Sequence, residues 1–225
     1  MKKLSFVVAL VAFFLVVPRL AMAEAYDDSI NAARMGDVAT LKTLLDKGLL
    51  ADTVDANGNT LLMLAAREGN ADVVRLLLER GAKVGYQNPT GDTALAVAAL
   101  EGHKAVVDQL LAAGAPIGNS GWTPFIYAAF NGHLDIVKTL AERGAIIDQR
   151  APNQSTALML AARNGHLEVV RYLLGKGADA TLANDQGRTA RSWALEKGNT
   201  DIAALIDANL KARGIQPKPL TIEIN

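Results

Sequence analysis

The sequence predicts an all-α solenoid, in which about six helix-turn-helix repeats stack side by side and β-hairpin-like loops project from one edge. The main observation is a glycine that returns along almost the whole chain. It occupies Gly36, Gly69, Gly102, Gly132, Gly165 and Gly198, at intervals of 33, 33, 30, 33 and 33 residues. A period of this length is typical of stacked repeats, in which each unit buries its apolar surface against its neighbours.

Each repeat contains two apolar segments on either side of this glycine. A threonine opens the first segment in five copies, as Thr60, Thr93, Thr123, Thr156 and Thr189, and four copies have an Ala-Ala pair five residues later. A threonine side chain can cap the free N–H groups of a helix, and small alanines let the first helix approach its neighbours. Glycine lets the chain reverse, and the second segment shows helical spacing, as in residues 73–78. About ten turn-rich residues then predict a loop, which we call a finger.

These features resemble ankyrin repeats. The best copy contains Thr123-Pro124-Phe125, Gly132-His133 and Gly144-Ala145, which match the Thr-Pro-Leu, Gly-His and Gly-Ala signatures of that 33-residue repeat. Where ankyrin repeats carry a loop-bracing histidine after Thr-Pro-Leu, this chain has Met63, Ala96, Ile126, Met159 and Ser192. We expect apolar packing to replace the bracing hydrogen bonds, or the bonds to be lost.

Residues 1–23 predict a signal peptide. Lys2 and Lys3 precede an apolar stretch over residues 4–17, and Ala21-Met22-Ala23 has the form of a cleavage site. The alternative is an uncleaved membrane anchor, but these 14 residues fall short of the about 20 needed to span a bilayer. We expect an exported, periplasmic protein that starts near Glu24, with secretion or N-terminal anchoring as alternatives.

The mature chain divides into a repeat domain, residues 24–208, and a C-terminal tail, residues 209–225. The six predicted repeats cover residues 25–57, 58–90, 91–120, 121–153, 154–186 and 187–208. The first and last have polar outer faces, as terminal repeats must have because they face water. The tail contains Pro217 and Pro219, and its Ile222/Ile224 alternation is too short to establish a strand.

Composition excludes several functions. The chain has no cysteine, and removal of residues 1–23 leaves 20 basic and 23 acidic side chains, a balance that argues against nucleic acid as a partner. No phosphate-binding loop, Gly-x-Ser-x-Gly or His-Glu-x-x-His motif occurs, so we expect neither an enzyme nor a cofactor.

His103, His133 and His166 recur with the repeat, and we expect them to cap the second helix. Neighbouring helices lie about 8–10 Å apart, whereas zinc needs ligands at about 2 Å. We therefore expect no metal to be shared by these histidines.

Candidate partner-binding residues come from positions that vary between copies. In ankyrin arrays the residues just before the inter-helix glycine line the concave face, and these and the finger tips give the following candidates: Arg67, Glu68, Tyr86, Leu100, Glu101, Trp122, Phe130, Asn131, Arg163 and Asn164. Apolar Leu100, Trp122 and Phe130 lie in the middle, between polar flanks, as in a protein-interaction hot spot with its rim. Alternatively, Trp122 folds over its loop and Phe130 packs sideways.

The third finger is short. Six residues separate Gly114 from Gly121, against nine between Gly81 and Gly91. The shortening could admit a protruding element of a partner, or could be neutral, because loops tolerate changes of length.

The function that we expect is a monomeric module that binds one protein partner through its concave face and finger tips. Resemblance to small exported ankyrin proteins of bacteria suggests two sharper alternatives, an accessory factor for an oxidative-stress enzyme such as a catalase, and an immunity protein against a secreted toxin. A structural protein that binds the cell envelope is a third. One aromatic cluster without a basic stripe favours a single protein partner over a polymer.

Overall fold

A computed structural model describes residues 23–118 and 121–216, and this part of the chain is built from helices. The first helix covers residues 23–35. The others are α2 (Val38–Asp46), α3 (Leu61–Arg67), α4 (Ala71–Glu79), α5 (Ala94–Glu101), α6 (Lys104–Ala112), α7 (Pro124–Phe130), α8 (Leu134–Glu142), α9 (Ala157–Arg163), α10 (Leu167–Gly175), α11 (Ala190–Glu196) and α12 (Thr200–Ala212). The predicted signal peptide before Ala23 and the tail after Gln216 lie outside the described residues.

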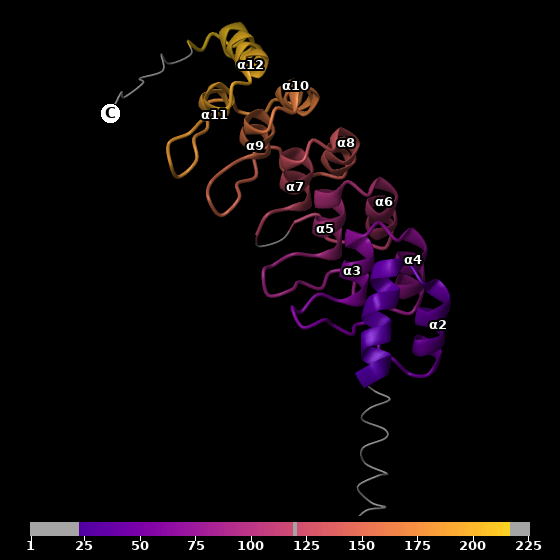
Figure 1. The fold of residues 1–225 in the computed structure, drawn as a ribbon. Helices are drawn as coiled ribbons and strands as arrows, with labels where there is room; N and C mark the ends of the chain where they lie inside the picture. The colour runs from indigo at the N-terminus through magenta and orange to yellow at the C-terminus, as the bar shows by residue number, and fades with distance from the viewer. Residues whose placement is uncertain (1–22, 119–120, 217–225) are drawn as a thin grey trace, which may run out of the picture.

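The helices form two rows, which confirms the predicted all-α array of about six helix pairs (Figure 1). The inner row holds the first helix, α3, α5, α7, α9 and α11, and the outer row holds α2, α4, α6, α8, α10 and α12. The fingers project from the inner row, and the array curves toward them (Figure 1). None of the described helices is long and apolar enough to cross a membrane.

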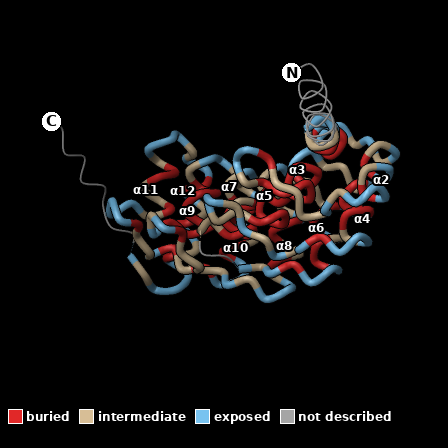
Figure 2. Tube along the Cα trace, turned by 90° about the horizontal axis from the view of Figure 1, so that it is seen from below, coloured by how far each residue is buried: buried red, intermediate tan, exposed pale blue. Residues whose placement is uncertain are grey.

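Buried residues lie mainly on the helices, where the two rows face each other, and exposed residues lie on the fingers and the outer surface (Figure 2). The alanine pairs are fully buried, as the sequence predicts: Ala65, Ala66, Ala98, Ala99, Ala128, Ala129, Ala161 and Ala162 each show 0% exposure. Branched residues of the outer helices, such as Val73 and Leu77 of α4, pack against them. The core is therefore continuous along the array, and no single repeat could form it alone.

Threonine caps the inner helices, as predicted. The hydroxyl of Thr60 accepts the N–H of Met63 at 3.2 Å, and the same bond recurs in α5, α7, α9 and α11. Met63 is buried, as are the residues that take its place in the next three repeats. Apolar packing thus replaces the loop-bracing histidine there, whereas Ser192 in the last repeat forms a capping box with Thr189.

The prediction that the three histidines cap the outer helices is wrong. His133 stands before α8 but makes no side-chain cap; its Nε2 instead donates to the Leu100 carbonyl of the preceding repeat at 3.0 Å. His103 and His166 bond in the same way to Arg67 and Phe130, each at 2.8 Å. We call these contacts cross-repeat bonds.

Asparagine takes the place of histidine in the cross-repeat bonds near the ends of the array. The Nδ2 atom of Asn70 donates to the carbonyl of Arg34 at 2.8 Å, and that of Asn199 donates to the carbonyl of Arg163 at 3.0 Å. The position therefore needs a side chain that can donate a hydrogen bond to the preceding repeat.

The fingers connect each outer helix to the next inner helix and are numbered in chain order: residues 47–60, 80–93, 113–123, 143–156 and 176–189. They are hairpin-like in a limited sense. The first and last contain isolated antiparallel bridges, Val54 with Thr60 and Ala183 with Thr189. In the second finger the N–H of Asn88 donates to the carbonyl of Asp92 at 3.0 Å, which closes the loop without a ladder. Residues 119–120 of the short third finger lie outside the described part.

The bases of the outer fingers are joined by hydrogen bonds between neighbouring repeats. Asp52 accepts the N–H of Lys83 at 2.8 Å, and Asp148 accepts the N–H of Asp179 at 3.1 Å. We call these finger-base bonds. In the two middle positions the acceptor is replaced by Gly85 and by Gly118, which have no side chain.

The last helix is longer than the predicted array. We expected the tail to begin at residue 209, but α12 continues to Ala212 because Leu210 is buried against the core. The Nε of Arg191 also pairs with Oδ1 of Asp207 at 2.5 Å, which fastens α12 to α11.

Candidate protein-binding face

Three aromatic rings meet on the inner row beside the short finger. Trp122 ends that finger, and Tyr127 and Phe130 lie one turn apart on α7. The ring centroids of Trp122 and Tyr127 are 5.4 Å apart with a tilt of 33°, and those of Trp122 and Phe130 are 5.7 Å apart in an edge-to-face arrangement of 82°. Such pairs stabilise beyond their area burial. All three side chains are half-buried, and we call them the aromatic cluster.

The cluster combines the two arrangements that the sequence leaves open. Trp122 packs against its neighbours instead of standing free, yet it keeps part of its ring accessible, as does Phe130. Leu100, also half-buried, ends α5 in the preceding repeat. A partly exposed apolar surface therefore occupies the middle of the inner row.

Tyr127 was missed by the sequence reasoning. Its hydroxyl donates to Oδ1 of Asp92 in the second finger at 3.0 Å. Burial, with the nearby negative charge of Asp92 and this hydrogen bond, raises the pKa of Tyr127 to about 12. The available signal was its repeat position, four residues after the capping threonine, where three other copies have the aliphatic residues Leu64, Val97 and Leu160.

Two of the polar candidates serve the scaffold. The Nδ2 of Asn131 donates to the Leu100 carbonyl at 2.7 Å, and that of Asn164 donates to the Phe130 carbonyl at 2.8 Å. Each carbonyl thus accepts both an asparagine and a histidine from the next repeat. These bonds fix the backbone beneath the half-buried side chains of Leu100 and Phe130.

The charged candidates on the N-terminal side are free to meet a partner. Arg67, Glu68 and Glu101 are exposed, and their side chains make no hydrogen bond or ion pair within residues 23–118 and 121–216. Tyr86 lies in the second finger, half-buried against the core and outside the aromatic cluster.

Arg163 differs from the other arginines of the inner row. Its guanidinium carbon lies 5.0 Å from the ring centroid of Trp193, which is 7% exposed on α11. A hollow of about 300 Å³ opens beside this stack; we call it the C-terminal hollow, and it is lined by Asn153, Arg163, Asn184, Asp185, Gln186, Trp193, Glu196 and Lys197. Trp193 occupies the same repeat position as Tyr127, so the same signal could have found it.

Metal chemistry finds no support in the described part of the chain. No group of three or more His, Asp or Glu side chains is placed there to hold an ion. The three histidines direct Nε2 at backbone carbonyls instead.

The paired helices, the fingers and the concave inner row are those of a stacked-repeat protein. A family model described as "Ankyrin repeats (3 copies)" matches residues 29–88, 81–151 and 144–213. The chain therefore belongs to the ankyrin repeat family. No curated protein sequence matches the chain. Ankyrin repeats are protein–protein interaction modules, which is the general function that this family membership implies.

Proposed function

We propose that this protein is an exported, periplasmic interaction module that binds one partner protein through its concave inner row. The observation that carries the proposal is the aromatic cluster of Trp122, Tyr127 and Phe130 at the centre of that row. Rigid aromatic rings with an exposed edge are the residues that most often dominate the free energy of protein association. The edge-to-face packing holds the rings in place before a partner arrives, which lowers the entropy cost of binding.

The charged side chains beside the aromatic cluster favour a partner protein whose surface carries charges of both signs. Arg67, Glu68 and Glu101 are exposed and unpaired within the described residues, on the N-terminal side of the aromatic cluster. Charges at the rim of an interface contribute to the association rate and to the choice of partner more than to affinity. Both signs are present, so the surface favours a mixed-charge protein over a polyanion.

Export is supported by the N-terminal pattern of Lys2, Lys3, an apolar stretch and Ala21-Met22-Ala23. Protein recovered from the periplasmic fraction should begin at Glu24 when its N-terminus is sequenced. Recovery of a chain that still carries residues 1–23 would contradict cleavage.

The binding proposal is tested with Trp122→Ala combined with Phe130→Ala. Loss of a hot-spot residue costs about 2 kcal/mol or more, which is a factor of about 30 in affinity. Capture of the partner from envelope extract by the immobilised protein, followed by titration of the identified partner, should show a loss of at least that factor.

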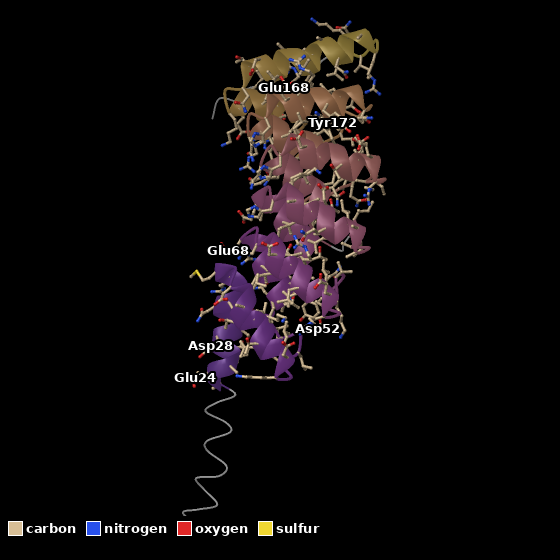
Figure 3. All side chains as sticks on the ribbon, turned by 90° about the vertical axis from the view of Figure 1, so that its right-hand side faces the viewer. Glu24, Asp28, Asp52, Glu68, Glu168 and Tyr172 are labelled. Atoms are coloured by element: carbon tan, nitrogen blue, oxygen red, sulfur yellow. The ribbon has the colours of Figure 1, made fainter. Side chains whose placement is uncertain are left out.

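The matched control is Tyr172→Ala. Tyr172 is a half-buried aromatic residue of α10 in the outer row, away from the fingers (Figure 3). This variant should retain partner affinity. Thermal unfolding of both variants must stay cooperative, because Trp122 also packs on Tyr127. Undiminished capture, or collapse of the fold, would refute the hot spot.

A further inference from the structure

We propose that the C-terminal hollow is a binding site for a carboxylate, supplied by an aspartate or glutamate side chain of the partner. The assignment of this carboxylate to the partner protein rests on the proposed function. The chemistry of the site itself rests on Arg163, Trp193 and the walls around them.

Arg163 is held in place without any of its donors being used. The guanidinium stacks at 5.0 Å over the ring of Trp193, which is itself 7% exposed and fixed in the core. Stacking with a cation–π contribution restricts the plane of the guanidinium. Its side chain makes no hydrogen bond or ion pair within the described residues, so five N–H groups remain available in a fixed fork.

The walls of the hollow are fixed as well. The N–H of Asp185 donates to the carbonyl of Asn153 at 3.4 Å, which joins the fourth and fifth fingers. Arg150 Nη1 donates to the carbonyls of Gln154 and Ala183 at 3.1 and 3.0 Å, across the same two fingers. The hollow thus lies between two linked fingers and the ends of α9 and α11, and it needs little ordering when a ligand enters.

The charges around the hollow favour an anion with a single charge. Glu196 is neutralised by Arg188, whose Nη1 lies 2.6 Å from its Oε2. Arg163 and Lys197 then face one unpaired acid, Asp185, among the lining residues. The balance is one positive charge, which suits a carboxylate and is insufficient for a phosphate dianion. A carboxylate also matches the guanidinium fork with two parallel hydrogen bonds.

The second repeat offers a matched control within the same chain. Helix α3 reads LLMLAAR and ends at Arg67, and α9 reads ALMLAAR and ends at Arg163. The residue at the position of Trp193 is Val97 in the repeat after Arg67, so that arginine has no ring to stack on. Arg67 is exposed. The two arginines share their helix and position but differ in the support that would make a site.

The hollow also lies within reach of the aromatic cluster. Neighbouring inner helices are about 8–10 Å apart, which puts the hollow between α9 and α11 about 12–15 Å from α7. An extended chain rises about 3.3 Å per residue, so about four residues would connect the two sites. A partner segment that fits both has an acidic residue about four positions from its apolar anchor.

The test uses NMR of the ¹⁵N-labelled protein, with the indole N–H of Trp193 as the reporter and that of Trp122 as the internal reference. N-acetylglutamate amide is the probe, and N-acetylglutamine amide is its uncharged isostere. The glutamate probe should shift the Trp193 resonance in a saturable way and the glutamine probe should not. Arg163→Gln should weaken binding at least tenfold and Lys197→Gln about threefold, while Arg67→Gln should leave it unchanged.

Three outcomes would overturn the carboxylate site: equal shifts with the glutamine probe, unchanged binding by Arg163→Gln, or tighter binding of inorganic phosphate than of the glutamate probe. The titration needs no partner. A negative result therefore removes the carboxylate site and leaves the aromatic cluster as proposed, whereas undiminished capture by the Trp122/Phe130 variant refutes the proposed function alone. If the partner supplies the carboxylate, Arg163→Gln should also lower the affinity for the purified partner at least tenfold. An unchanged affinity would overturn the assignment of the carboxylate to the partner.

Discussion

At the scale of single residues, Tyr127 connects the candidate binding face to the finger row. Its ring packs against Trp122, and its hydroxyl donates to Asp92 in the second finger. Its ring thus belongs to the aromatic cluster, while its hydroxyl holds the neighbouring finger relative to α7. The hydrogen bond needs the neutral phenol, because a phenolate has no proton to donate and would face the carboxylate of Asp92.

This arrangement predicts a pH dependence. The pKa of Tyr127 is about 12 in the folded protein, against about 10 in an unfolded chain. Between these values the unfolded chain releases the proton while the native state keeps it, so the free energy of unfolding falls as pH rises. The stabilisation is complete below about pH 10 and lost as pH passes the native pKa.

Absorbance titration of tyrosinate in the folded protein checks this prediction. Tyr127→Phe should remove the amplitude of one tyrosine from the late step near pH 12, and burial also raises the pKa of Tyr172, which keeps its own late titration. In Asp92→Asn the step should move down only in part, because burial, the largest cause of the shift, remains. An undiminished amplitude of the late step in Tyr127→Phe would contradict the assignment.

At this scale the sequence indicated part of the candidate binding face, which stays a prediction. Trp122 and Phe130 were identifiable because they depart from what the other copies carry at the same positions. The rings that pack against Trp122 could not be predicted in this way, because they depend on how the chain folds around it. The same holds for Asn131 and Asn164, which donate to carbonyls more than 30 residues away in the preceding repeat. A repeat position alone does not reveal which face of a side chain its neighbour covers.

At the scale of elements, a side chain and a glycine together fix the position of a helix pair on the preceding one. The side chain forms the cross-repeat bond, and the inter-helix glycine of the preceding repeat leaves room for it. Gly102 has φ of +83°, and a Cβ placed on it would lie 2.5 Å from Cε1 of His133. Glycine is thus required twice, for the left-handed conformation and for the space taken by the histidine ring. Gly69 and Gly132 stand in the same relation to His103 and His166.

These two requirements can be separated. Gly198 holds the same repeat position with φ of +77°, but no atom of the described residues lies within 4 Å of a Cβ built there. Gly198→Ala should cost only the conformational strain, about 1–2 kcal/mol. Gly102→Ala should cost at least about 1 kcal/mol more, because overpacking is added.

Urea unfolding of the two variants measures the difference. Adding His133→Ala to Gly102→Ala should recover part of the overpacking cost, since the ring that the new methyl group meets is gone. Equal losses for Gly102→Ala and Gly198→Ala would show that the close approach to His133 has no energetic consequence.

The elements themselves were largely predictable. The capping threonines, alanine pairs and glycines follow from local physics that a sequence displays, and the helices begin where those residues predict. The role of the histidines was not predictable from local physics, because a residue placed before a helix suggests a cap, whereas its true partner lies in the preceding repeat. The end of α12 at Ala212 depended on burial of Leu210, which is also a tertiary effect.

At the scale of the whole molecule, finger-base bonds join the finger row near its two ends, whereas the residues described at its centre form none. Finger-base bonds link the first finger to the second, and the fourth to the fifth. Between the second and third fingers, Gly85 offers no side-chain acceptor and Pro116 has no N–H to donate. Between the third and fourth fingers, Gly118 offers no side-chain acceptor for the N–H of Ile146. The side chain of Ile146 is 66% exposed beside a hollow of about 130 Å³.

Gly118→Asp should restore one of these bonds. No described atom lies within 4 Å of a Cβ on Gly118, so the side chain has room to accept the N–H of Ile146. A hydrogen bond of this kind stabilises by about 0.5–1.5 kcal/mol. Amide hydrogen exchange should show slower exchange at Ile146, and urea unfolding should show a gain within that range.

Gly85→Asp is the matched control for this substitution. It also has room, since the nearest atom to a built Cβ is Cδ of Pro116 at 3.5 Å, but proline offers no donor. The control should give no gain. A gain from Gly85→Asp as large as that from Gly118→Asp would contradict the finger-base bond as the cause.

The missing finger-base bonds at the centre of the finger row have a mechanical consequence. There, among the described residues, the hydroxyl of Tyr127 holds the second finger to α7 through Asp92 instead. A load that straightens or tightens the arc would therefore be carried at the centre by the inner helices and the aromatic cluster. A partner that grips the rings would then set the curvature of the entire concave face, and with it the distance between the charges near Arg67 and the fork of Arg163.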